Sequence, residues 1–97
     1  MQHKEVKALR KAVETMHNCK ALYIKSKAVH EIFEGKTAWK GEVAIFKIQR
    51  HPATTRCYAW SFKEGDETKS VAVLEIPPVD SVESAVRVAI AAKARAK

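Results

Sequence analysis

Cationic and aromatic side chains gather in one stretch of the sequence, at Arg50, His51, Arg56, Tyr58 and Trp60. Basic groups neutralise phosphates while exposed rings stack on bases, so this combination is typical of proteins that bind single-stranded nucleic acid. The same residues also suit a structural role, in which the arginines lie at the end of a hairpin and the rings fill a core. The sequence leaves both interpretations open.

A second basic candidate is the outer face of an amphipathic helix near the N-terminus. Val6, Leu9 and Val13 recur at helical spacing, which places lysines on the opposite side, where they can be a solvated surface or an anion-binding face. The net charge of +7 favours an anionic partner, either nucleic acid or a membrane surface. The candidate anion- or nucleic-acid-binding residues are Lys4, Lys7, Lys11, Arg50, His51 and Arg56.

No residue pattern matches a catalytic, metal or phosphate-binding signature. Structural zinc sites usually combine clustered ligand pairs, and the four histidines and two cysteines have no such spacing. No nucleophile elbow and no glycine-rich phosphate loop occur. Cys19 and Cys57 are expected to stay thiols in a reducing compartment. We therefore predict a cytoplasmic, non-enzymatic binding module without cofactor or metal, and without a membrane span, because no apolar run approaches about 20 residues.

The 97 residues fit a single α+β domain, 1–97. The spacing of apolar residues predicts a helix over 3–18, strands over 21–33, 39–49, 56–62 and 70–76, and a second helix after Pro77-Pro78 with Asp80 as its N-cap. The predicted order is thus α-β-β-β-β-α, with a four-stranded antiparallel meander sheet. Gly41 suggests a bulge in the second strand. Whether the first strand is continuous stays open.

The predicted sheet has two apolar faces. If large residues pair across strands, Phe46 lies opposite Trp60 and Ile48 opposite Tyr58. One face then carries the bulky side chains, and the other carries smaller ones such as Cys57 and Ala59. The residues of the predicted bulky face that are candidates for an interface are Phe46, Ile48, Tyr58, Trp60, Phe62 and Leu74.

The apolar stripes of the two helices are narrow, so we expect both helices to pack on the face with small residues. The bulky face would then stay open, and monomers rarely expose an apolar patch of that size. The leading hypothesis is therefore a homodimer that covers this face. The alternatives are that the helices lie on opposite sides of the sheet, that the protein binds nucleic acid, or that a small-ligand pocket or enzyme site lies between helices and sheet.

Several short runs resemble a family of small uncharacterised bacterial proteins. They are Trp39-Lys40-Gly41-Glu42-Val43, His51-Pro52, Cys57-Tyr58-Ala59-Trp60 and Pro77-Pro78-Val79-Asp80-Ser81. The resemblance covers most of the chain, and it implies no activity, cofactor or binding residue.

Overall fold

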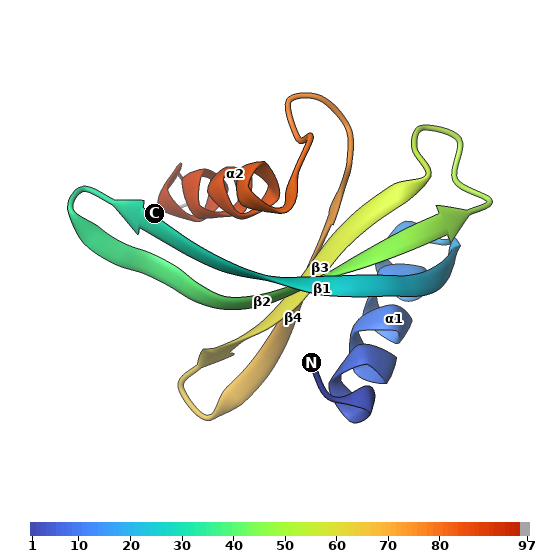
Figure 1. Cartoon of the computed structure of the whole chain (residues 1–97), viewed down its shortest axis with the longest axis horizontal. Helices are drawn as coiled ribbons and strands as arrows, with labels where there is room; N and C mark the ends of the chain where they lie inside the picture. Colours follow the sequence, from blue (N-terminus) through green and yellow to red (C-terminus); the bar gives the residue numbers. More distant parts are fainter. Residues whose placement is uncertain (96–97) are drawn as a thin grey trace.

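The computed structural model describes residues 1–95 and has the predicted order of elements, α-β-β-β-β-α (Figure 1). Two helices flank one open antiparallel sheet in which neighbouring strands follow the chain order β1-β2-β3-β4. No helix among residues 1–95 is long and apolar enough to cross a membrane. The elements are α1 His3–His17, β1 Lys20–Phe33, β2 Lys36–Gln49, β3 Arg56–Glu64, β4 Glu67–Leu74 and α2 Val82–Arg95.

The first two strands form a long hairpin of 14 residues per strand. β1 is continuous, and its pairing with β2 shifts register between Tyr23 and Lys25 and again between Glu31 and Ile32. Gly41 pairs regularly with Val29, so the predicted bulge at Gly41 is wrong. The added Cβ of any other residue there would lie 2.8 Å from Cζ2 of Trp39, so the glycine makes room for an indole ring instead.

The N-cap of the second helix lies one residue later than predicted. The Ser84 backbone N–H donates to the Ser81 hydroxyl at 3.1 Å, and the Ala85 N–H donates to the Ser81 carbonyl at 3.0 Å. Ser81 therefore caps the helix in place of Asp80. Glu83 lies in the first turn and binds Lys27 of β1 at 2.8 Å, which ties α2 to the long hairpin.

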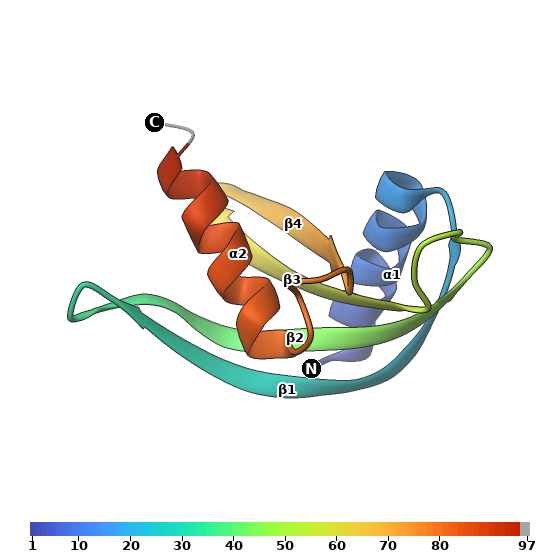
Figure 2. The same cartoon turned by 90° about the horizontal axis from the view of Figure 1, so that it is seen from above.

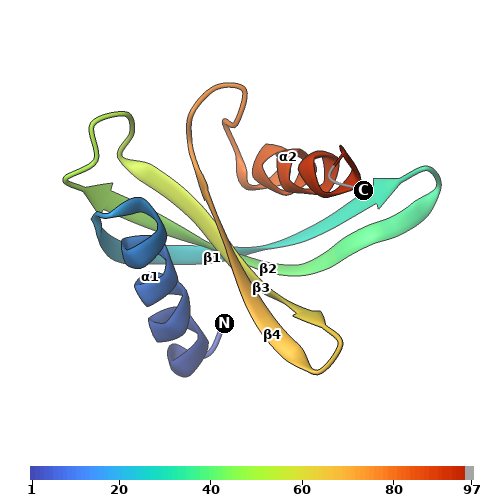
Figure 3. The same ribbon diagram turned by 180° about the vertical axis from the view of Figure 1, so that it is seen from behind.

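The helices pack on opposite faces of the sheet, so the prediction that both pack on one face is wrong. Leu9 and Val13 of α1 pack with Phe46, whereas α2 packs with Tyr58 and Trp60. Figures 1 and 3 show the helices on opposite sides of the strands and toward opposite ends of the sheet, and Figure 2 shows how strongly the sheet curves between them. Both faces of the sheet are apolar, so both must be shielded from water. Each helix packs its apolar stripe against one of the two faces.

The register between β2 and β3 differs from the predicted register by three residues. Phe46 lies opposite Cys57, not Trp60, and Lys47 lies opposite Arg56. The Ile48 N–H donates to the Thr55 carbonyl at 2.8 Å, and Arg50 has a positive φ of 66°, so the connection between the strands is longer than expected. Because side chains alternate along a strand, an odd shift moves every side chain to the other face.

The bulky residues are consequently divided between two cores, one under each helix, and the predicted open aromatic face does not exist. Phe46, Ile48 and Leu74 lie on the α1 side, whereas Tyr58 and Trp60 lie on the α2 side. The exposed fractions are 0% for Phe46, 1% for Ile48, 2% for Tyr58 and 3% for Trp60. Phe62 and Leu74 are half-buried.

Candidate functional site

One end of the α2-side face is left uncovered by the helix and is strongly basic. Leu22, Lys47 and Arg56 lie directly opposite one another on β1, β2 and β3, so they form a row across the sheet. Alternation and register place further exposed side chains on the same face. We call this surface the basic sheet face, and its residues are Lys20, Leu22, Lys25, Lys47, Gln49 and Arg56.

Within residues 1–95, the cations of the basic sheet face lack the carboxylate partners that other basic residues have, although Arg56 lies close enough to Tyr58 to oppose the rise in its pKa. Lys27, Lys69 and Arg87 each lie 2.8 to 2.9 Å from a carboxylate. Within residues 1–95, no ion pair joins Lys20, Lys25, Lys47 or Arg56 to an acid. Like charges directly opposite each other on a sheet are destabilising, and Lys47 and Arg56 are such a pair. The fold therefore tolerates concentrated positive charge here.

Tyr58 marks the border between the basic sheet face and the core under α2. Its hydroxyl donates to the Glu75 carboxylate, and the ring is buried. Burial, with a smaller contribution from Glu75, raises the pKa of Tyr58 to about 12. The ring is therefore not available for stacking on a base, and Glu75 is already an acceptor for the tyrosine.

The predicted basic residues are only partly brought together. Arg56 lies on the basic sheet face, and Arg50 is exposed just after β2. His51 accepts a hydrogen bond from the Ala53 N–H at 3.1 Å and packs edge-on against His17, with ring centroids 6.4 Å apart, which is a structural role. The exposed lysines of α1 lie on the other side of the sheet, so they form a separate surface; these are Lys4, Lys7 and Lys11.

Sequence reasoning missed the cations on the first two strands. Lys47 stands alone within a run of buried side chains, Val43 to Ile48. A single lysine in such a run marks a position that must face solvent, and the correct register would have placed it beside Arg56. Lys20 and Lys25 were missed because the bulge between Tyr23 and Lys25 changes which residues of β1 share a face.

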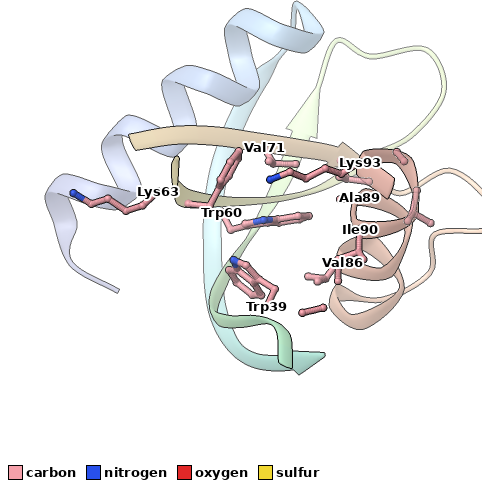
Figure 4. A pocket seen from close by; sticks show the side chains of 13 residues that line it. Trp39, Trp60, Lys63, Val71, Val86, Ala89, Ile90 and Lys93 are labelled. Carbon is pink, nitrogen blue, oxygen red and sulfur yellow. The ribbon is translucent and has the colours of Figure 1, made fainter. Parts of the chain in front are cut away.

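At the other end of the same face, the strands separate and leave an apolar groove. β2 and β3 pair only over Ala44–Lys47 and Arg56–Ala59, so the remaining parts of the two hairpins diverge as two arms. α2 spans the two arms, as the view from above shows (Figure 2). The groove has a volume of about 630 Å³, and its lining includes Trp39, Trp60, Val71, Val86, Ala89 and Ile90 (Figure 4).

The two tryptophans of the chain meet in the groove. Their ring centroids are 5.8 Å apart, one from each hairpin arm. Trp39 is half-buried and lies against Gly41, whereas Trp60 is buried beneath it. Two lysines also line the groove, but Figure 4 shows only the Lys93 ammonium directed into it, whereas that of Lys63 points away.

Lys93 is the cation of the groove mouth. Its ammonium nitrogen lies 5.2 Å from the centroid of the Phe62 ring and 3.9 Å from a Glu64 oxygen. The other Glu64 oxygen is 2.9 Å from Lys69, and this closer lysine is the main reason that the pKa of Glu64 is lowered. Lys93 is thus incompletely neutralised.

The cysteines are suited to packing and not to nucleophilic chemistry. Both are buried free thiols, and burial raises the pKa of Cys57 to about 12. Among residues 1–95, no three His, Cys, Asp or Glu side chains come together as a metal site requires. Comparison with known protein families, characterised proteins and solved structures finds no match to the chain. The resemblance noted from the sequence stays a prediction.

Proposed function

We propose that this protein is a non-enzymatic module that binds the phosphate backbone of nucleic acid through the basic sheet face. The observation that carries the proposal is the row of exposed side chains in which Lys47 lies directly opposite Arg56, neither of which has an ion pair within residues 1–95. Phosphates that approach such a row relieve the repulsion between neighbouring cations and release condensed counterions.

The geometry favours recognition of the backbone over recognition of bases. Stacking requires an exposed ring beside the cations, and Tyr58 is buried and bonded to Glu75. Leu22 is the apolar side chain on this face and has no hydrogen-bonding group to read a base edge. We therefore expect affinity to depend strongly on salt and weakly on sequence.

The decisive experiment compares two double variants that remove the same charge from different sides of the sheet. Lys47→Gln/Arg56→Gln removes two cations of the basic sheet face, and Lys7→Gln/Lys11→Gln removes two from α1. Binding of a mixed-sequence DNA duplex is measured by fluorescence anisotropy between about 50 and 200 mM salt. The slope of log K against log salt is negative, and each lost phosphate contact should reduce its magnitude by about 0.9. In Lys47→Gln/Arg56→Gln, the magnitude of the slope should therefore fall by about 1.8.

The α1 variant should keep the slope of the wild type. Equal losses in the two variants would show that net charge, and not this surface, causes binding. Absence of binding by the wild type at about 50 mM salt would contradict the proposal outright. Binding to vesicles that contain phosphatidylserine, without binding to duplex, would assign the face to membranes and would also contradict it.

We do not propose self-association through the aromatic residues, because four of the six side chains predicted for that interface are buried within one chain. Their burial leaves the predicted dimer without the surface on which it depended.

A further inference from the structure

We propose that the groove between α2 and the two hairpin arms binds a small amphipathic anion, namely a single alkyl chain that ends in a carboxylate. This site is separate from the basic sheet face and does not depend on the proposed binding of nucleic acid. The groove and the basic sheet face lie at opposite ends of the region that α2 covers.

The lining of the groove supports an apolar body for the ligand. Trp39, Val73 and Ile90 are only partly buried, although they pack against the core under α2. The core under α1 also has partly buried residues at its edge, such as Val6 and Leu74, but the pocket described here is lined from the α2 side. A volume of about 630 Å³ lies within the range of about 300–1,000 Å³ in which small-molecule sites fall.

The charge at the mouth supports an anionic head group. Lys93 is the cation directed into the groove, and its side chain is 67% exposed. Glu64 lies nearby but is held more closely by Lys69, so the three groups together carry a net positive charge. A carboxylate that reaches Lys93 while its alkyl chain covers Trp39 and Trp60 satisfies both parts of the site. An alkyl cation meets the same apolar surface but is repelled at the mouth.

Tryptophan fluorescence reports directly on this site, because the chain has two tryptophans and both line the groove. The full chain is titrated with decanoate, with decyltrimethylammonium and with decanol, all below their aggregation concentrations. We expect decanoate to shift the emission and to bind more tightly than the other two probes. Equal affinity for the anion and the cation would overturn the proposal, as would an unchanged emission with decanoate.

Three variants locate the binding. Ala89→Phe fills the groove from α2 and should abolish the decanoate response. Lys93→Gln should weaken decanoate about two- to fivefold, which is the range of exposed ion pairs, and should not weaken decanol. Lys11→Gln on α1 is the matched control and should bind as the wild type does.

The Lys47→Gln/Arg56→Gln variant separates this site from the basic sheet face. It should bind decanoate with unchanged affinity while losing nucleic acid, so failure of one proposal can be distinguished from failure of the other. Unchanged decanoate binding by a folded Ala89→Phe variant, or equal weakening by Lys93→Gln and Lys11→Gln, would place the ligand elsewhere and contradict the inference.

Discussion

The two faces of the sheet are covered by helices of similar length, yet they differ in how completely they are closed. On the α1 side, Leu9 and Val13 seal a core around Phe46. On the α2 side, the first turns of the helix bury Val82 and Val86, whereas later residues such as Ile90 stay half-exposed. α2 therefore closes the middle of its face and leaves a basic end and an apolar groove. The α1 side contributes a closed core, and the α2 side carries both of the binding sites that we propose.

A matched pair of truncations should give the largest contrast between the faces. Phe46→Ala removes a fully buried ring under α1 and should lower the free energy of unfolding by about 3–5 kcal/mol. Phe62→Ala removes a half-buried ring beside the groove and should cost about 1 kcal/mol, because less apolar area is lost. Urea denaturation with both the midpoint and the slope m measures each change.

The two variants share their chemical change and differ in face, so each is the control for the other. Equal losses of stability would show that the groove side is as tightly packed as the α1 side. A change in m for Phe62→Ala would point to altered compactness and not to a simple loss of contact.

The succession of elements was predictable from sequence because it depends on local signals. Helical stripes and the break at Pro77-Pro78 act over a few residues, and both match the structure. The pairing of β2 with β3 was not predictable in this way. It depends on the conformation of the loop between the strands, where Arg50 has a positive φ and the connection is longer than the predicted register allows.

That one register error accounts for much of what was wrong about the candidate site. A shift of three residues moved Trp60 to the α2 side, away from Phe46, and it brought Lys47 beside Arg56. Arg56 was identified as a candidate from sequence, but its neighbours were not. The groove could not be located, because it arises where the paired segment of β2 and β3 ends, and no local signal in either strand specifies that point.

Alkaline pH should lower the free energy of unfolding through Tyr58, which is buried on the α2 side. Burial raises the pKa of Tyr58 to about 12 from its ordinary value of about 10. The unfolded chain therefore loses this proton first, so stability is complete below pH 10 and falls as the pH rises toward 12. The loss should be at most about 1.4 kcal/mol per pH unit.

Tyr58→Phe has no phenolic proton and should be free of this part of the decline. Urea denaturation at pH 9, 10 and 11 measures the free energy of unfolding of the wild type and of Tyr58→Phe. The difference between these two free energies should become smaller as the pH rises. Tyr23→Phe removes an exposed hydroxyl and is the matched control. An equal narrowing in both variants would mean that the buried Tyr58 hydroxyl is not the source.

The smallest expected effect comes from a substitution at Gly41. It tests whether the Trp39 ring, on the α2 side, can move when space beside it is lost. In Gly41→Ala, the new Cβ would lie 2.8 Å from Cζ2 and 2.9 Å from Cη2 of Trp39. These atoms are at the far end of a half-buried side chain, so we expect the indole to move into the groove and the backbone to stay in place. Because alanine also restricts the unfolded chain, the net change in stability should stay within about 1 kcal/mol.

The displacement should be visible in fluorescence and in a double-mutant cycle. In a Trp60→Phe background, Trp39 is the single tryptophan, and Gly41→Ala should shift its emission. When Trp39→Ala removes the ring, Gly41→Ala should become more favourable than in the wild type by about 0.5–1 kcal/mol. No coupling together with unchanged emission would mean that the indole does not rest on Gly41. In that case, the divergence of the two hairpins alone would set the width of the groove. Gly41→Ala would then leave the affinity for decanoate unchanged.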